Sequence, residues 1–147
     1  MGLKIAIGCD HAGVDYKNRL AEYLKSSGYE VFDCGTYGKE SVDYPIFAEK
    51  VCKSVIGSEA DFGILICGTG IGMSMAANKF KEIRAALCTD VIMAEFTRKH
   101  NNANVLCMGA RIIAYEMAEA VTEKFLNTDF EGGRHCKRIE MFSCSCC

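Results

Sequence analysis

The stretch Ile64-Leu65-Ile66-Cys67-Gly68-Thr69-Gly70-Ile71-Gly72-Met73-Ser74 decides the fold of this chain. An apolar run typical of a buried strand ends on Cys67, a glycine-rich turn follows at once, and the segment 75–80 is compatible with a helix. This order places a thiol at the carboxyl end of a strand, beside the unpaired backbone N–H groups of a helix start. Such groups stabilise negative charge and make a nearby thiol more acidic. The stretch therefore predicts a site that removes a proton and stabilises the resulting oxyanion.

The same alternation of strand and helix extends over the rest of the chain. Strands are expected at 3–8, 30–33, 62–67, 84–88 and 105–108, and helices at 14–27, 44–56, 74–80, 90–100 and 113–126. The strand runs are continuously apolar, which is typical of a sheet covered on both faces. We therefore predict an α/β fold, an open five-stranded parallel sheet with helices on both faces. Such sheets bind ligands at the carboxyl ends of their strands, and we expect the candidate residues there or in the C-terminal tail.

Composition and charge narrow the class of protein. The 147 residues are half hydrophobic and about one quarter charged, as in ordinary globular proteins, and we expect one domain over residues 1–142. The net charge of −2 gives no support for binding to nucleic acid or to an anionic membrane. No apolar run approaches the ~20 residues of a membrane span, and no secretory signal pattern opens the chain. We expect a cytoplasmic protein.

Ten cysteines are an unusually high number for such a chain. Without a secretory signal, most of them are interpreted as small buried apolar residues in a reducing cytosol. The residues Cys144, Cys146 and Cys147 differ, because they lie on a tail, 143–147, that we predict to be disordered. A metal site on this tail would need further ligands, and no histidine or second cysteine pair has the spacing to supply them.

The glycine turn matches neither of two familiar nucleotide-binding loops. A dinucleotide fingerprint requires glycine where Met73 stands, and a P-loop requires Lys followed by Ser or Thr. We favour an oxyanion or phosphate nest formed by the backbone N–H groups of residues 70–74, with an ordinary tight turn as the alternative. Cys67 is then a proton-abstracting base, with a buried structural cysteine as the alternative, because the turn opens the thiol to a ligand.

Two polar pairs offer recognition of hydroxyl groups and anions. Asp10 and His11 follow the first strand, where the carboxylate would hold sugar hydroxyls and the imidazole would meet an anion. The alternative is a polar loop. His100 and Asn101 close the fourth helix, and the alternative there is a histidine that only interacts with the helix dipole.

The tail carries the densest basic stretch of the chain. Arg134 and Arg138 are four residues apart, so on a helix they share one face and form a phosphate clamp, to which Arg111 adds a third cation. A solvated charged turn is the alternative. We see no cluster of carboxylates with histidine that would hold a catalytic divalent ion, and we expect chemistry without metal or cofactor. The predicted parts are a base, an oxyanion nest, an acid that works near neutral pH and a phosphate clamp. Together they indicate proton abstraction next to the carbonyl of a phosphorylated sugar.

Five motifs spread over residues 8 to 138 carry a family resemblance. They are Gly8-Cys9-Asp10-His11-Ala12-Gly13, Asp43-Tyr44-Pro45, Ile66-Cys67-Gly68-Thr69-Gly70-Ile71-Gly72, Arg98-Lys99-His100-Asn101-Asn102-Ala103-Asn104 and Gly132-Gly133-Arg134-His135-Cys136-Lys137-Arg138. Together they resemble the type B ribose-5-phosphate isomerases, within the wider family of galactose-6-phosphate and allose-6-phosphate isomerases. The resemblance implies a three-layer α/β/α Rossmann-like sandwich and a homodimer with active sites shared between subunits. It also implies metal-independent interconversion of ribose 5-phosphate and ribulose 5-phosphate through a cis-enediolate.

The same resemblance assigns roles to single residues. Cys67 matches the base, His100 matches the residue that assists ring opening with Thr69 nearby, and Asp10 matches a ligand of substrate hydroxyls. Some members place a glutamate near position 74 or 75, where Ser74 and Met75 stand here, so the cysteine subtype applies. The oxyanion nest comprises Gly68, Gly70, Ile71, Gly72, Met73, Ser74 and Asn101. The phosphate ligands are His11, Arg134, Arg138 and, from the partner subunit, Arg111; His135 belongs to the same tail motif.

Three other functions stay open at this point. The same chemistry could act on a hexose 6-phosphate, which needs about one more carbon of room between Cys67 and the arginines. A non-catalytic phosphate-sensing module would need the clamp but neither Cys67 nor His100. A thiol redox protein is the third, although no Cys-x-x-Cys pair flanks a strand end.

Overall fold

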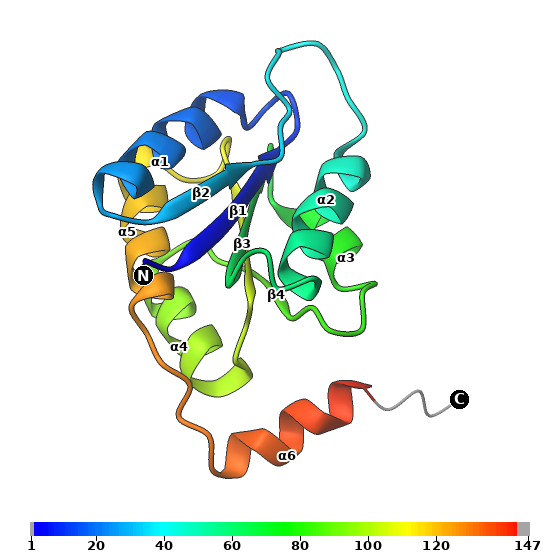
Figure 1. The fold of residues 1–147 in the computed structure, drawn as a ribbon, viewed down its shortest axis with the longest axis vertical. Coiled ribbons are helices and arrows are strands. Elements are labelled where there is room, and N and C mark those ends of the chain that lie inside the picture. Colours follow the sequence, from blue (N-terminus) through cyan, green and yellow to red (C-terminus); the bar gives the residue numbers. More distant parts are fainter. Residues whose placement is uncertain (1, 144–147) are drawn as a thin grey trace.

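The protein is a three-layer α/β/α sandwich around one parallel sheet, as the sequence predicts (Figure 1). The computed structural model describes residues 2–143. The strands are β1 (Lys4–Cys9), β2 (Glu30–Asp33), β3 (Phe62–Cys67), β4 (Ala85–Leu87) and β5 (Val105–Gly109), in the order β2-β1-β3-β5-β4. The helices are α1 (Val14–Ser26), α2 (Tyr44–Ile56), α3 (Ile71–Ala77), α4 (Val91–Asn101), α5 (Tyr115–Leu126) and α6 (Arg134–Glu140), followed by a 3₁₀ turn at Met141–Ser143.

The pleat of the strands divides the core into two layers. Ile64 and Ile66 of β3 face α1, α4 and α5, whereas Leu65 and Cys67 face α2 and α3. Figure 1 shows these two groups of helices on opposite sides of the sheet. The alternation therefore directs the side chain of Cys67 toward the side on which α3 begins.

The helix after the glycine turn begins earlier than the sequence analysis predicts. It starts at Ile71 rather than at residue 74 and ends at Ala77, because Gly70 has a φ of +79° and turns the chain from strand to helix within three residues. The Asn78 side chain then bonds the main chain of Ala85 in both directions, at 2.9 Å each. These bonds occupy part of the free edge of β4, at one end of the sheet.

The helix α4 runs opposite to the strands, as crossover helices do in a parallel sheet. It starts near the carboxyl end of β4 and ends at the amino edge, where the Nε of Arg84, just before β4, donates to the carbonyl of Asn102 at 2.8 Å. The N–H of Glu131 donates to the carbonyl of Lys99 at 3.1 Å and joins the segment before α6 to this end of α4. Figure 1 shows α6 beyond the end of α4, away from the loop that follows β2.

Two predictions concern the rest of the chain. Within residues 2–143, no helix is both long and apolar enough to cross a membrane. The cysteines Cys144, Cys146 and Cys147 lie outside the described residues, and the prediction about this tail stays a prediction. The helix α6 was not among the elements expected from the sequence, although the four-residue spacing of its arginines anticipates a helix there.

Candidate active site

The candidate site lies at the topological switch point of the sheet. The strand order reverses between β1 and β3, which pair in parallel with Cys9 opposite Ile66. Asp10 follows β1 directly, and its N–H donates to the carbonyl of Ile66 at 3.1 Å. The carboxylate of Asp10, only 7% exposed, therefore stands next to the end of β3, which carries Cys67. Ligands of open α/β sheets bind at such switch points.

The sulfur of Cys67 accepts a hydrogen bond from the backbone. The N–H of Gly70 donates to the Sγ of Cys67 at 3.0 Å, in a turn that the positive φ of Gly70 makes possible. The Sγ of Cys9 instead donates to the carbonyl of Thr36 at 3.7 Å, and burial raises the pKa of that thiol to about 12. The two sulfurs therefore differ in their hydrogen bonds, because that of Cys67 accepts a backbone N–H whereas that of Cys9 donates to a carbonyl.

The predicted oxyanion nest is narrower than residues 70–74. The N–H of Ile71 bonds the Oγ1 of Thr69 at 3.3 Å, and the N–H of Ser74 already makes the first helical bond, to the carbonyl of Gly70 at 3.1 Å. The N–H of Ser74 is therefore already paired in this structure, and its place in the nest stays a prediction. Among the described residues, the N–H groups at the start of α3 that lack a protein acceptor belong to Gly72 and Met73.

The imidazole of His11, which follows β1, is held in one tautomer. Its Nδ1 accepts the N–H of Val42 at 3.3 Å, so the proton of a neutral ring sits on Nε2, which is left as a donor for an anion. One carboxylate oxygen of Asp10 accepts the N–H of Ala12 at 2.9 Å, and the other is left for a ligand hydroxyl. These contacts fit the roles predicted for the two residues.

Arg111 lies on the same side of the molecule as Cys67, within one chain. Its N–H donates to the carbonyl of Gly68 at 3.0 Å, and its guanidinium packs 3.4–3.6 Å from the place where a Cβ on Gly68 would be. We predicted that Arg111 reaches the site from a partner subunit. Within one chain it already lies at the end of β5, whose last residue pairs with Cys67, and we therefore propose below that it serves the site of its own chain.

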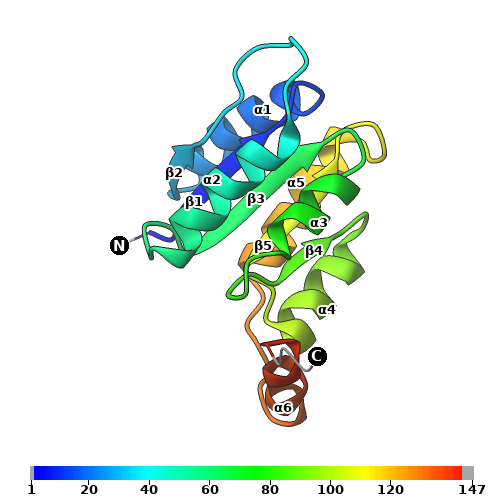
Figure 2. The ribbon, with the colours of Figure 1, turned by 90° about the vertical axis from the view of Figure 1, so that its right-hand side faces the viewer.

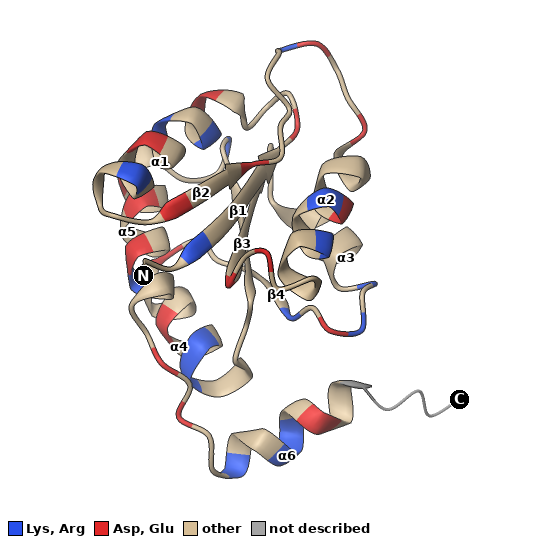
Figure 3. Ribbon diagram, in the orientation of Figure 1, with Lys and Arg blue, Asp and Glu red and all other residues tan. Residues whose placement is uncertain are grey.

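The other predicted residues are not at this edge. His100 and Asn101 end α4 at the amino edge of the sheet, and Arg134 and Arg138 lie on α6 beside them. Figure 3 shows the basic residues of α6 at the far end of the molecule from the loop that follows β2. The expectation that all candidate residues outside the tail meet at the carboxyl edge was wrong for His100 and Asn101, because a helix returning between parallel strands ends at the opposite edge. Asn101 instead lines a cleft of about 510 Å³ with Arg84, Ile139 and Phe142, so its assignment to the nest beside Cys67 does not hold within one chain.

Comparisons with known proteins show which family the chain belongs to. A family model described as ribose/galactose isomerase matches residues 5–142. The chain is 47% identical to ribose-5-phosphate isomerase B of Escherichia coli (strain K12) over 137 residues, which are 93% of this chain and 92% of that protein.

The chain belongs to the ribose/galactose isomerase family.

Solved structures of this family share the fold closely. A ribose 5-phosphate isomerase from Thermotoga maritima superposes with a TM-score of 0.95 at 51% identity, over 97% of this chain and 99% of that one. The corresponding enzyme of Clostridium thermocellum has a TM-score of 0.95 at 48% identity, over 96% and 95% of the two chains. The prediction of an isomerase of sugar phosphates, acting in carbohydrate metabolism, is confirmed.

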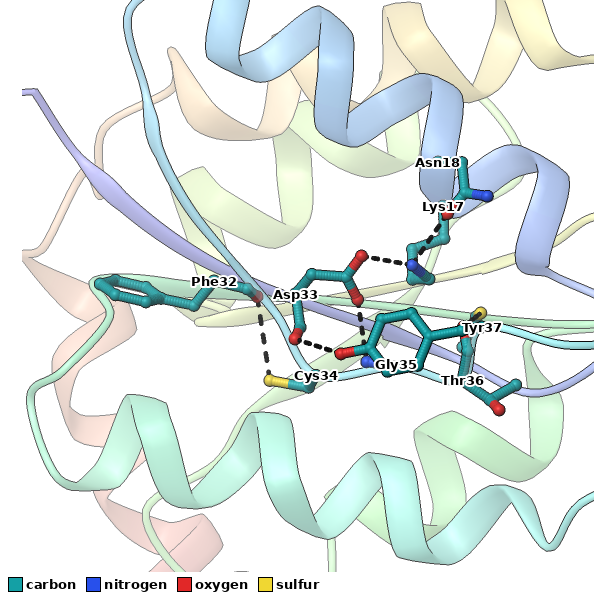
Figure 4. Close-up of polar contacts among 9 residues, drawn as sticks. Lys17, Asn18, Phe32, Asp33, Cys34, Gly35, Thr36 and Tyr37 are labelled. Atoms are coloured by element: carbon teal, nitrogen blue, oxygen red, sulfur yellow. Dashed lines mark hydrogen bonds and ion pairs between the residues drawn. The ribbon is translucent and has the colours of Figure 1, made fainter.

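A buried lysine that was not among the predicted residues, Lys17, holds the segment after β2 in this isomerase (Figure 4). The fully buried Lys17 ammonium bonds a carboxylate oxygen of Asp33 at 2.5 Å and lies 5.0 Å from the ring centre of Tyr37. The other oxygen of Asp33 accepts the N–H of Gly35 at 2.9 Å, and the carbonyl of Gly35 accepts the N–H of Cys9 at 2.7 Å. A charged residue among the apolar positions of a helix was the signal that could have found it.

A second overlooked residue is Tyr44, at the start of α2. Its ring lies so close to Gly72 that a Cβ there would be 2.7 Å from the Tyr44 Cζ. The motif Asp43-Tyr44-Pro45 marked the segment, but only the packing of α2 on α3 brings its ring to the start of α3. Tyr44 therefore forms a wall of the space above the N–H groups of Gly72 and Met73.

His100 of α4 and His135 of α6 form a cluster with Glu131 that was not predicted from the sequence. The rings of His100 and His135 stack with centroids 4.4 Å apart, and the Nε2 of each lies 3.8 Å from the same carboxylate oxygen of Glu131. The three residues form a group of possible metal ligands, whereas the expectation that no such group holds a catalytic divalent ion stays a prediction. The contacts depend on the folding of α6 against the end of α4, which no local pattern encodes.

Proposed function

We propose that this isomerase interconverts ribose 5-phosphate and ribulose 5-phosphate, without metal, through a cis-enediolate formed by a cysteine base. The observation that carries the proposal is the turn after β3, where the Sγ of Cys67 accepts the N–H of Gly70 at 3.0 Å beside two unpaired N–H groups. A thiolate next to oriented N–H donors suits the removal of a proton next to a carbonyl. The activity named for the Escherichia coli relative supports the choice of a pentose phosphate.

The proposed chemistry follows from the positions of the groups. The Cys67 thiolate takes the proton from C2 of the open-chain aldose and returns it to C1, and the hydroxyl proton of O2 passes to O1, so that C2 becomes the carbonyl carbon. The N–H groups of Gly72 and Met73 stabilise the charge that develops on the substrate oxygen, and a preorganised donor of this kind contributes roughly 2.7–4 kcal/mol. The carboxylate of Asp10 holds the substrate hydroxyls, and the Nε2–H of His11 and the guanidinium of Arg111 face the phosphate.

We propose that the second half of the site comes from another copy of the chain. His100, which would assist ring opening, and the phosphate ligands Arg134 and Arg138 lie at the opposite edge of the sheet from Cys67. A two-fold axis that pairs the carboxyl edge of one subunit with the amino edge of the other would complete two equal sites. This homodimer accounts for both halves of the predicted set.

Exposed apolar side chains support this pairing. They lie on the two helices that flank the edge strand β4, as Figure 2 shows for the helices themselves, and they would be covered by a second copy. These residues are Ile71 and Met75 of α3, and Ile92, Met93 and Phe96 of α4. None of the seven described cysteines is in a disulfide, which fits the reducing cytoplasm that we propose as the location.

A coupled assay of ribose 5-phosphate isomerisation tests the function, with the variant Cys67→Ala and the matched control Cys107→Ala. Both cysteines are buried in the same core cluster, but only Cys67 meets the turn. We expect Cys67→Ala to keep its fold and phosphate affinity and to lose the exchange of the C2 proton with solvent, whereas Cys107→Ala stays active. Full exchange in Cys67→Ala would remove Cys67 from the role of base.

The chemically closest alternative is the same reaction on a hexose 6-phosphate, which the family description includes. The ratio of kcat/KM for ribose 5-phosphate to that for allose 6-phosphate decides between them. A ratio well above one supports the pentose, and a ratio below one would replace it with the hexose.

A further inference from the structure

The cluster of His100, Glu131 and His135 has the composition of a metal site. Its members come from the end of α4, the loop after α5 and the first turn of α6, and one ligand atom of each lies within 4.8 Å of the others. The two Nε2 atoms are each 3.8 Å from one oxygen of Glu131, which is longer than a hydrogen bond. The carboxylate therefore faces two imidazoles without being hydrogen-bonded to either.

The distances between the ligand atoms suit a small divalent ion. With sides of 3.8, 3.8 and at most 4.8 Å, the point equidistant from the three atoms lies no more than about 2.5 Å from each, close to the ~2.0–2.2 Å of zinc bonds to nitrogen and oxygen. A contraction of a few tenths of an ångström, with rotation of the stacked rings, would bring the three groups into contact with one ion. The backbone bond from Glu131 to Lys99, at 3.1 Å, anchors the loop in that position.

The charge around the cluster suits an exchangeable ion. His135 is buried, and Arg134 and Arg138 belong to the same short helix. The same arginines repel a cation, and Glu131 is the carboxylate that offsets them. Lys99 is paired with Glu95 at 2.5 Å, and its charge also interacts with that of Glu131. These opposing effects indicate reversible rather than permanent occupation.

We propose that His100, Glu131 and His135 bind one divalent transition metal of the zinc class, and that the bound metal inhibits the isomerase. Two imidazoles and one carboxylate form a ligand set that zinc accepts, with one position left for water. Because the ring of His100 cannot ligate a metal and assist ring opening at the same time, occupation withdraws it from the reaction. The inhibition rests on the proposed function, whereas the binding does not.

The test measures binding and activity separately on the full chain, first freed of metal with a chelator. Binding is followed by calorimetry with Zn²⁺ and by the visible absorption of Co²⁺, for wild type, Glu131→Gln and the matched control Glu140→Gln, which changes an exposed carboxylate on α6 outside the cluster. Thiolates elsewhere in the chain also bind these ions, so the quantity of interest is the difference between the two variants. We expect Glu131→Gln to lose one bound ion or to bind it at least about tenfold more weakly, and Glu140→Gln to match wild type.

The activity arm uses the same three proteins in the coupled assay. Metal-free Glu131→Gln should isomerise ribose 5-phosphate like wild type and need at least about tenfold more Zn²⁺ for half inhibition, with Glu140→Gln again as wild type. Equal Co²⁺ and Zn²⁺ binding by Glu131→Gln and wild type would overturn the site. Normal binding without inhibition would overturn the inhibitory role. Absence of isomerisation in metal-free wild type would instead overturn the proposed function, and the binding arm would still decide the metal site.

Discussion

In the proposed homodimer each site draws on two chains, so mixing two inactive variants should restore activity. The first variant, Cys67→Ala, lacks the proposed base at the carboxyl edge of the sheet. The second, Arg134→Ala/Arg138→Ala, lacks the proposed phosphate ligands on α6. In a heterodimer, one site combines both defects, and the other combines an intact edge from one chain with an intact tail from its partner. Random association of equal amounts gives about one half heterodimers, and hence about one quarter of the wild-type number of sites.

The size of the defect in the tail variant makes the recovery measurable. Each guanidinium–phosphate interaction contributes roughly 1.5–3 kcal/mol, so loss of both lowers kcat/KM by about two to four orders of magnitude. The two variants are unfolded together, refolded as a mixture and assayed with ribose 5-phosphate at concentrations below KM, with each variant refolded alone as a reference. Recovery to about 25% of the wild-type rate is expected.

The matched control pairs two changes on the same edge. Cys67→Ala mixed with Arg111→Ala leaves no intact site in any combination, because Gly68 holds Arg111 beside the Cys67 of its own chain. This mixture should recover no isomerase activity. If the first mixture also recovered nothing although heterodimers formed, each site would lie within a single chain. Equal recovery in both mixtures would show that Arg111 reaches the site from the partner.

Three further results are expected from the packing. Gly109→Ala would place a Cβ 2.6 Å from the backbone of Thr69, so it should lower the free energy of unfolding by about 1–3 kcal/mol in urea titrations and reduce kcat; wild-type values for both would contradict the close approach. Lys17→Met leaves the carboxylate of Asp33 without its cation and should cost about 3 kcal/mol, near the lower end for buried pairs because Asp33 is 29% exposed; a loss below 1 kcal/mol would contradict this. Burial raises the pKa of Cys52 to about 12, so it should react with iodoacetamide roughly a thousandfold more slowly than exposed Cys136, as followed by mass spectrometry at pH 8; similar rates would refute its burial.

Much of the carboxyl edge could be predicted because its determinants are local. A continuous apolar run followed by Gly68, Gly70 and Gly72 specifies a strand, a turn with positive φ and a helix start within a dozen residues. The same reasoning placed Asp10 and His11 correctly, since they follow directly on β1. The start of α3 was missed by three residues, because the turn at Gly70 is tighter than composition alone indicates.

The sequence by itself determined the layered α/β fold, the strand that ends on Cys67 and the residues at its carboxyl edge. Only the tertiary structure decided which of the remaining residues can meet that edge. It carries His100 to the opposite edge because α4 runs against the strands, and it stacks His135 on His100 because α6 packs on the end of α4. It also consumes the N–H of Ser74 in the first turn of α3 and buries Lys17 beside Asp33. These outcomes depend on the direction of elements and on contacts between distant segments, which no local pattern of residues contains.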